Sequence, residues 1–233
     1  MPVLVTLPPR GKGPFPVVLL VHPLGGDRHQ ITREVAGAMA AKGFACVALD
    51  LPKHGEREGK PNELFVSDDA ARTYKNVVGT IVDIRQTIDL IKQRKDLDAD
   101  KPVAAVGYSL GAWFATLAGA ADRRVSCLVL QGGGVGPIGE PTKNRNKLFS
   151  VERGLLDRYS TIRPQVAIAQ FAPRPIFMQN GTKDPFIPED SARDLYRHAK
   201  PPKEIKFYDC GHILPEKAKQ DAAEWVKKIT EKR

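Results

Sequence analysis

The sequence has no long hydrophobic run and no recognisable export signal, and these absences limit what the protein can be. None of the apolar stretches in the 233 residues approaches the roughly 20 residues that a membrane-spanning helix needs. The first residues, MPVLVTLPPRGKG, lack the basic segment followed by an apolar segment that marks a signal peptide. We therefore expect a protein with no membrane span, cytoplasmic unless a leader has been removed.

Cysteines are also scarce. The three that occur, Cys46, Cys127 and Cys210, show no close spacing, which argues against a disulfide framework or a zinc site. Cys46 and Cys127 lie in apolar runs typical of strands, so we expect buried thiols there. Cys210 lies close to His212 and is either a reactive thiol or a loop cysteine without a role. The sequence implies no metal and no organic cofactor.

Basic residues outnumber acidic ones. The 36 Lys and Arg residues against 27 Asp and Glu residues give a formal net charge of +9. Many basic residues are spread over expected helix faces and the C-terminal segment 217–233, and no recognisable nucleic-acid module accompanies them. The excess either keeps the surface hydrated or favours anionic surfaces or substrates. We expect no nucleic-acid partner.

Short apolar runs alternate with amphipathic segments along the whole chain. The interior runs lack polar alternation, as expected for parallel strands that are covered on both faces. The pattern predicts an α/β fold in one domain over 1–233, with a mainly parallel central sheet of about seven strands and helices on both faces. The expected strands are Val3–Thr6, Val17–Val21, Ala45–Leu49, Val103–Gly107, Val125–Leu130, Ile176–Gln179 and Ile205–Tyr208. The expected helices are Ile31–Lys42, Asp69–Arg94, Leu110–Ala121, Pro188–Lys200 and Pro215–Thr230.

One interval, residues 132–172, interrupts this alternation. It opens with Gly132-Gly133-Gly134, carries scattered charges and offers two short expected helices, Phe149–Tyr159 and Gln165–Phe171. The interval is longer than a usual loop between a strand and a helix. It is either a small lid or substrate wall, or an excursion that packs against the body of the domain.

The segment Gly107-Tyr108-Ser109-Leu110-Gly111 is the most informative part of the chain. It follows the apolar run Val103–Val106 and precedes the expected helix Leu110–Ala121. A serine on a sharp turn from a strand to a helix projects its hydroxyl out of the sheet, and small residues on both sides allow the strand and the helix to pack closely. Ser109 is therefore the candidate nucleophile.

A serine hydroxyl is a weak nucleophile and needs a general base to take its proton. Five histidines are available: His22, His29, His54, His198 and His212. His212 follows the last expected strand in a loop that precedes the final helix, which favours it as the base. The others end a strand, open a helix, lie in a loop or lie in the last turn of a helix.

The base must be oriented by an acid. Asp184 lies in the segment Gly181-Thr182-Lys183-Asp184-Pro185, just after the expected strand Ile176–Gln179. The chain order Ser109, Asp184, His212 is the one expected of hydrolases that carry their serine on such a strand-to-helix turn. Asp209, which is close to His212 in sequence, is the rival. We favour Asp184, because it would face the imidazole from the side.

Negative charge on the substrate oxygen needs hydrogen-bond donors. One is expected to be the backbone N–H of Leu110, directly after the nucleophile. The other would come from the segment 22–26, His-Pro-Leu-Gly-Gly, where the Leu24 N–H is favoured because Pro23 has no N–H. The alternative for this segment is a tight glycine-rich turn without a role in catalysis.

Five segments in this order resemble the α/β-hydrolase superfamily over the whole chain. They are HPLGG at 22–26, DLPKHGERE at 50–58, GYSLG at 107–111, GTKDPFIP at 181–188 and CGH at 210–212. The small size and the segment Ala172-Pro173-Arg174-Pro175 are similar to the dienelactone-hydrolase-like esterases. Dienelactone hydrolases proper use a cysteine where this chain has Ser109, and relatives often carry glycine where it has Pro23. The sequence before the Val17 strand is also short for the family.

The expected activity is that of a serine carboxylic ester hydrolase acting on small-molecule esters with short to medium acyl chains, through an acyl-enzyme. The alternatives are a serine hydrolase or acyltransferase for thioester or peptide-like substrates, and a binding protein without catalysis. A monomer or a homodimer is expected. Candidates to line a small apolar cleft are Trp113, Phe114, Phe149, Phe171, Phe186 and Ile187.

Overall fold

A seven-stranded sheet forms the centre of the computed structural model, which describes residues 1–66, 69–135 and 160–231. The strand order is β1-β3-β2-β4-β5-β6-β7; β1 is antiparallel to β3 and every other pair is parallel. The predicted α/β class with a mainly parallel sheet is confirmed. The strands are β1 (Val3–Thr6), β2 (Val17–Val21), β3 (Ala45–Leu49), β4 (Val103–Tyr108), β5 (Val125–Gln131), β6 (Ile176–Gly181) and β7 (Lys203–Tyr208).

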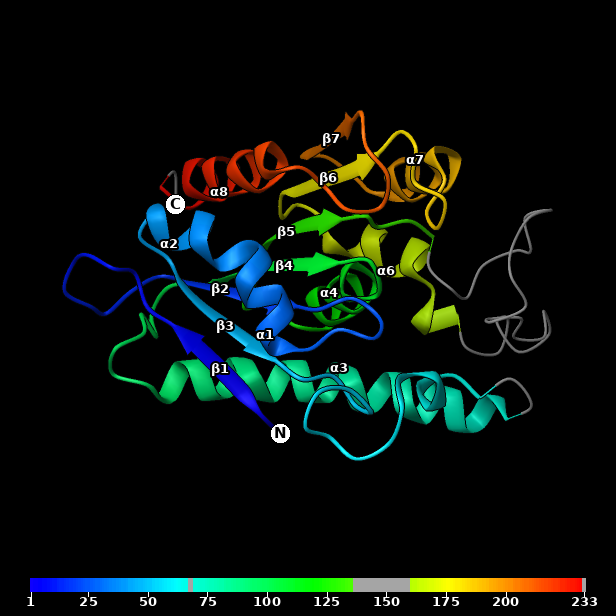
Figure 1. Cartoon of the computed structure of the whole chain (residues 1–233), viewed down its shortest axis with the longest axis horizontal. Helices are drawn as coiled ribbons and strands as arrows, with labels where there is room; N and C mark the ends of the chain where they lie inside the picture. The colour runs from blue at the N-terminus through cyan, green and yellow to red at the C-terminus, as the bar shows by residue number, and fades with distance from the viewer. Residues whose placement is uncertain (67–68, 136–159, 232–233) are drawn as a thin grey trace.

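Helices cover both faces of this sheet (Figure 1). On one face lie α1 (Arg28–Ile31), the π-helical turn η1 (Thr32–Ala36), α2 (Gly37–Ala41) and α8 (Glu216–Thr230). On the other face lie α3 (Ala70–Gln93), α4 (Leu110–Ala121), α6 (Pro164–Phe171) and α7 (Glu189–His198). Two short 3₁₀ turns, η2 (Pro61–Leu64) and η4 (Ser160–Ile162), complete the described elements.

The two faces of the sheet explain why the interior strands show no polar alternation. Successive side chains of a strand point to opposite faces. Leu19 of β2 packs in the cluster that includes α3 and α4, whereas its neighbours Val18 and Leu20 pack in the cluster that includes α1 and α8. Both sets are fully buried. Every position of such a strand must therefore be apolar.

The observed starts of two helices differ slightly from the starts expected from the sequence. Asp27 accepts a hydrogen bond from the Gln30 N–H at 2.6 Å and starts a helix at Arg28, earlier than the predicted Ile31. Asp69 caps α3 in the same way, by accepting from the Arg72 N–H at 2.9 Å, so α3 starts at Ala70, one residue after the expected Asp69. The apolar stripe of α3 is buried at four positions. These are Val77, Ile84, Ile88 and Ile91.

Part of the unusual interval 132–172 can be placed. The expected helix Gln165–Phe171 is confirmed as α6, which packs in the core beside α4. The expected helix Phe149–Tyr159 lies outside the described residues. The role of the interval as a lid or as a packed excursion, and the single-domain organisation over 1–233, stay predictions.

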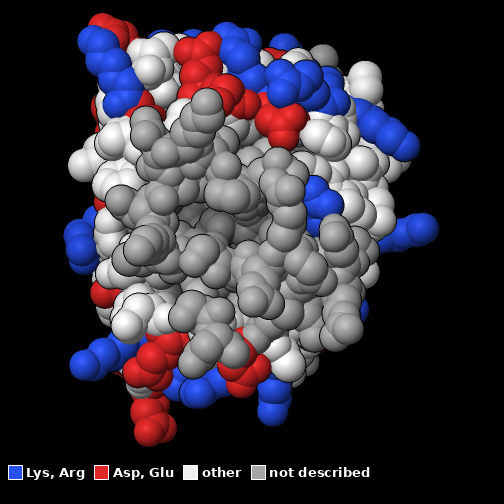
Figure 2. Space-filling view, turned by 90° about the vertical axis from the view of Figure 1, so that its right-hand side faces the viewer, with Lys and Arg blue, Asp and Glu red and all other residues white. Residues whose placement is uncertain are grey.

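The parallel strands end together at one edge of the sheet. Val21 of β2 pairs with Gly107 of β4, and Tyr108 of β4 pairs with Gln131 of β5. Gly181 of β6 pairs in turn with Tyr208 of β7. The loops that follow these strands therefore meet at the same edge. Figure 2 looks onto this end of the molecule, where charged side chains gather toward the upper and lower margins of the view.

One contact at this edge leaves no room for a side chain. A Cβ atom at Gly111, in the first turn of α4, would overlap the carbonyl oxygen of Val21, and backbone atoms cannot move aside as a flexible side chain can. Gly79, inside α3, has no atom within 4 Å of the same position. Gly111 therefore packs directly against another segment of the backbone, whereas Gly79 does not.

We predict opposite effects of alanine at these two glycines. Gly111→Ala should lower the free energy of unfolding by at least about 1–3 kcal/mol, because it forces α4 away from β2. Gly79→Ala should raise it by about 0.5–1 kcal/mol, because alanine favours a helix interior. Urea denaturation of the two variants measures both effects. Equal stability of the two would contradict the close packing of α4 on β2.

Candidate active site

Ser109 lies in a strained turn between β4 and α4. Its φ of 54° and ψ of −114° fall in a region that side chains rarely adopt, at a cost of order 1–3 kcal/mol. Gly107 and Gly111 flank it, and a Cβ at either position would overlap backbone atoms of another segment. The Ser109 side chain makes no capping hydrogen bond to α4. The turn thus presents a half-buried hydroxyl at the edge where the strands end.

Asp184 and His212 are joined directly. His212 Nδ1 lies 2.6 Å from Asp184 Oδ2, with 18% of the histidine side chain and none of the aspartate side chain exposed. The second carboxylate oxygen accepts the backbone N–H groups of Phe186 at 2.8 Å and Ile187 at 3.0 Å. The rival Asp209 is highly exposed and pairs with Lys183 at 2.7 Å. The structure therefore brings Asp184, and not Asp209, to His212.

These contacts set the charge of Asp184. Burial by itself raises the pKa of this carboxyl group, but the hydrogen bonds from His212, Ile187 and Phe186 outweigh it, and the pKa lies below its ordinary value. An ionised Asp184 accepts from Nδ1 and so favours the imidazole tautomer with its proton there. The other ring nitrogen, Nε2, is then free to accept a proton.

Tyr108, the residue before Ser109, contacts His212 in two ways. Its hydroxyl donates to the His212 backbone carbonyl at 2.6 Å, and its ring stacks on the imidazole with 5.5 Å between the ring centroids. Phe186 meets the same imidazole edge-on, at 5.2 Å. Sequence reasoning did not give Tyr108 a role. Its position next to Ser109 was the only feature of the sequence that pointed to the site. The ring contact exists because the end of β4 meets the loop after β7.

Ser109 is tied to the same region through its backbone. The Ser109 N–H donates to the carbonyl of Gln131 at 2.7 Å. The residue after Gln131, Gly132, lies so close to His212 that a Cβ there would be 3.1 Å from the imidazole Cε1. Among the described residues, no hydrogen bond joins Ser109 Oγ to the His212 ring. Such bonds often tighten only in the complex with substrate.

The segments that carry the two expected oxyanion donors, the start of α4 and residues 22–26, both follow strands that end at this edge. Leu110 is the first residue of α4, so its N–H has no acceptor within the helix. The segment 22–26 follows β2, which pairs with β4, and Gly111 packs directly against the carbonyl oxygens of Val21 and His22. The contact brings the start of α4 against the end of β2 and His22, and the roles of the Leu24 and Leu110 N–H groups stay predictions.

The other histidines have different environments. His22 is fully buried, and burial lowers its pKa to about 4 despite an opposing hydrogen bond with the Pro23 carbonyl. His54 is also buried, which lowers its pKa, and its ring centroid lies 5.0 Å from that of His22. His29 and His198 are exposed. None of these four touches Asp184 among the described contacts.

The expected apolar cleft is only partly supported. Trp113, Phe114 and Phe171 are buried in the core cluster and do not project at the edge. Phe186 is 68% exposed beside His212, and Ile187 is half-buried. Phe149 lies outside the described residues. The two aromatic residues that follow Ser109 on α4 are therefore core residues.

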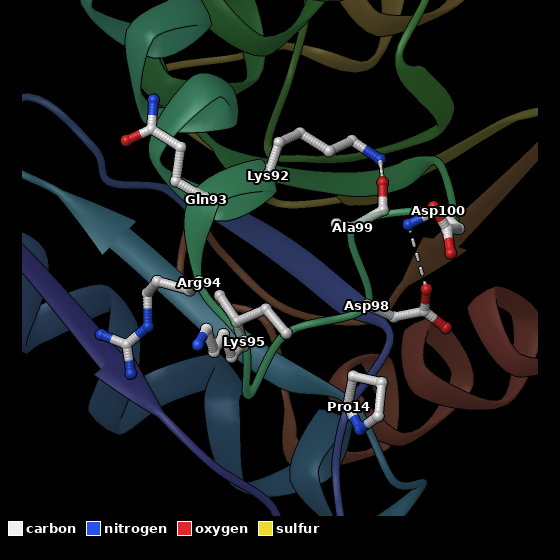
Figure 3. Close-up of a pocket in the computed structure, with 9 residues that line it drawn as sticks. Pro14, Lys92, Gln93, Arg94, Lys95, Asp98, Ala99 and Asp100 are labelled. Atoms are coloured by element: carbon white, nitrogen blue, oxygen red, sulfur yellow. Dashed lines mark hydrogen bonds between the residues drawn. The ribbon is translucent and has the colours of Figure 1, made fainter.

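A hollow of about 320 Å³ lies at the other end of the sheet (Figure 3). Its wall comes from the C-terminal end of α3 and from segments that precede β2 and β4, including Pro14, Lys92 and Asp98. It is open, and Lys92 is engaged with the backbone carbonyls of Ala99 and Lys101. It does not contribute to the site at Ser109.

Within 1–66, 69–135 and 160–231 no group of three or more His, Cys, Asp or Glu side chains is arranged to hold a metal ion. In that part of the chain no helix is both long and apolar enough to cross a bilayer.

Comparison with known proteins identifies the family of the chain. A sequence model described as the dienelactone hydrolase family matches residues 1–229. The chain belongs to the dienelactone hydrolase family. Among curated proteins it is similar to the uncharacterized protein YcjY of Escherichia coli (strain K12), with 28% identity over 114 residues. That match covers 49% of this chain and only 34% of the E. coli protein.

Solved structures share the fold. The structure of TT1662 from Thermus thermophilus has a TM-score of 0.76 at 24% identity and covers 99% of this chain and 94% of that one. An acetyl xylan esterase from Paenibacillus sp. R4 has a TM-score of 0.75 at 17% identity, covering 97% of this chain and 78% of that one. The α/β-hydrolase fold expected from the five sequence segments is confirmed.

We predict that the neutral, buried His22 makes the protein less stable in mild acid. Its folded pKa of about 4 lies below the unfolded value of 6.5, so the unfolded chain binds a proton first. The contribution of the neutral His22 to the free energy of unfolding is fully present above pH 6.5. It falls by about 3 kcal/mol as the pH drops from 6.5 to 4. His54 adds to the loss in the same direction.

Urea denaturation at a series of pH values checks this prediction. In His22→Asn the free energy of unfolding should depend less on pH across that window, by up to about 1.4 kcal/mol per pH unit. Parallel curves for the two proteins would contradict it.

Proposed function

We propose that the protein is a serine carboxylic ester hydrolase with Ser109 as nucleophile, His212 as general base and Asp184 as the residue that orients His212. The observation that carries the proposal is the 2.6 Å hydrogen bond between Asp184 and His212 at the strand edge that also presents Ser109 on its strained turn. A nucleophile, a base and an orienting acid from separate loops at one edge form the arrangement that activates a hydroxyl.

The steps of the reaction follow from these positions. Ser109 Oγ attacks the ester carbonyl carbon while His212 Nε2 takes the hydroxyl proton. The carbonyl oxygen becomes negative and accepts hydrogen bonds from the Leu24 and Leu110 N–H groups. His212 then gives its proton to the departing alcohol, which leaves an acyl-enzyme. Water, deprotonated by His212, attacks the acyl group and releases the acid and free Ser109.

Family membership and fold support ester chemistry. The chain belongs to the dienelactone hydrolase family, and a structural neighbour of similar shape is an acetyl xylan esterase. We propose small-molecule esters with short to medium acyl chains as substrates. Serine in place of the cysteine of dienelactone hydrolases proper makes the general base indispensable, because a hydroxyl, unlike a thiol, is hardly ionised near neutral pH.

Ser109→Ala tests the nucleophile. We expect turnover of a chromogenic short-chain ester to fall by about 10⁶-fold, or to the background rate, since the covalent step is lost. The melting temperature should stay within a few degrees of the parent value, because the backbone turn is kept. Labelling of the parent protein by an organophosphate, mapped to Ser109 by mass spectrometry, is the companion measurement. An unchanged rate in the variant would overturn the proposal.

Asp184→Asn and Asp209→Asn form a matched pair of loop carboxylates. We expect the first to lower kcat by up to about 10⁴-fold, because an amide at that place favours the wrong imidazole tautomer. The second should leave kcat within about twofold, since its exposed ion pair with Lys183 is worth little. The ratio of kcat between the two variants is the readout. Equal losses would assign no orienting role to Asp184.

Rates on matched substrates separate the ester from the alternatives. An oxygen ester, a thioester and an aminoacyl amide with the same acyl group should be compared by kcat/KM. The proposal expects the oxygen ester to be hydrolysed and the amide to be inert. Preference for the thioester or the amide would replace the ester assignment while keeping the three residues.

A further inference from the structure

We propose that His22 is a positioning residue for the oxyanion hole, in that its ring fixes the Pro23–Leu24 peptide group and so aims the Leu24 N–H at the reacting oxygen. The proposal rests on the ester hydrolase function given above and adds a residue that has no contact with the substrate. It explains why a fully buried histidine directly follows β2.

Both ring nitrogens of His22 are engaged. Nε2 lies 3.0 Å from the backbone N of Leu51, and Nδ1 lies 2.8 Å from the carbonyl oxygen of Pro23. The Leu51 N–H can only donate, so Nε2 is the acceptor and carries no proton. In a neutral imidazole the proton then sits on Nδ1, which donates to Pro23. The depressed pKa of about 4 keeps the ring neutral at ordinary pH.

The hydrogen bond to Pro23 decides the direction of the Leu24 N–H. The Pro23 carbonyl and the Leu24 N–H belong to the same planar peptide group, and in the trans form they point in opposite directions. None of the three cis peptide bonds of the described residues lies in 22–26. A carbonyl held toward His22 therefore turns the Leu24 N–H away from the imidazole.

A second donor reinforces this orientation. The Gly26 N–H donates to the same Pro23 carbonyl at 3.1 Å. Rotation of the peptide group would break both hydrogen bonds at once and leave a carbonyl without its donors. The turn is compact, since a Cβ at Gly26 would lie 3.2 Å from the Pro23 ring. The orientation is thus fixed before substrate arrives, which is what an oxyanion hole requires.

The turn is also anchored at both ends on the segment that follows β3. His22 binds Leu51 before the turn, and the Arg28 N–H donates to Asp50 Oδ1 at 2.8 Å after it. Asp50 is fully buried, and the Arg28 side chain pairs with it. Residues 50 and 51 therefore hold the stretch from 22 to 28 in place.

A comparison of oxygen and thiono esters tests this role. A thionoester carries C=S in place of C=O, and sulfur accepts hydrogen bonds poorly, so it gains little from an oxyanion hole. The measured quantity is kcat/KM for the oxygen ester divided by kcat/KM for its thiono analogue. We expect His22→Phe, which keeps a flat ring and removes both hydrogen bonds, to lower this ratio by about 10²-fold through kcat, with KM little changed.

His54→Phe is the matched control. His54 is a buried histidine whose ring neighbours that of His22, but its hydrogen bond among the described residues goes to the Pro52 carbonyl and not to the backbone of the turn at 23–26. It should leave the ratio within about threefold. A merely structural role for His22 would lower the rates on both esters together, with an unchanged ratio, and would overturn the proposal.

The isosteric amides keep the proposal testable if the phenylalanine variant does not fold. The amide nitrogen of His22→Asn lies near the place of Nδ1 and can donate to Pro23, whereas the amide of His22→Gln lies near Nε2 and reaches toward Leu51. We expect the asparagine variant to keep most of the ratio and the glutamine variant to lose it. The reverse order would show that the Leu51 contact, not the Pro23 contact, is what matters.

Nitrogen-15 NMR of histidine-labelled protein distinguishes failure of this proposal from failure of the proposed function. It should show His22 with its proton on Nδ1, and His22→Phe should shift the Leu24 amide resonance more than His54→Phe does. Lack of ester hydrolysis by the parent protein would refute the function and leave these spectra informative. A proton on Nε2 of His22 would refute the positioning role even in an active enzyme.

Discussion

The close approach of α4 to the end of β2 is the constraint on which the site depends. Gly111 lies against the carbonyl oxygens of Val21 and His22, with no room for a side chain between them. For the helix to begin so close to the neighbouring strand, the chain must turn sharply after β4, and Ser109 takes up that turn at a φ of 54°. The same contact packs the first turn of α4 against His22, where the turn at 22–26 begins. One steric constraint thus fixes the turn at Ser109 and the contact of α4 with the start of the 22–26 segment.

His212 and His22 differ because of their partners. His212 keeps some contact with solvent, faces an ionised carboxylate at Nδ1 and makes no hydrogen bond through Nε2 to any described residue. His22 has no exposure, and a backbone group occupies each of its nitrogens. The first arrangement suits a base, whereas the second can only hold the backbone in place.

A row of buried amides supports the loops that carry Asp184 and His212. The Gln131 side chain donates to that of Gln179 at 2.9 Å, and Gln179 donates in turn to the Tyr208 hydroxyl at 2.7 Å. Tyr208 then donates to Asp221 of α8 at 2.9 Å. The row crosses the ends of β5, β6 and β7, so these strand ends cannot shift independently of one another. Buried polar groups that are bonded in this way add rigidity where geometry matters.

The sequence by itself determined the fold class and the candidates. Short uninterrupted apolar runs are typical of strands that are covered on both faces, and Ser109, Asp184 and His212 could be named because each lies in the turn or loop after an expected strand. Only the tertiary structure decided between Asp184 and Asp209, and only it gave Tyr108 and His22 their contacts. The physical reason is that strand and helix patterns are local properties of the chain. A hydrogen bond between loops depends on how several strand ends are registered and on which way single peptide groups point.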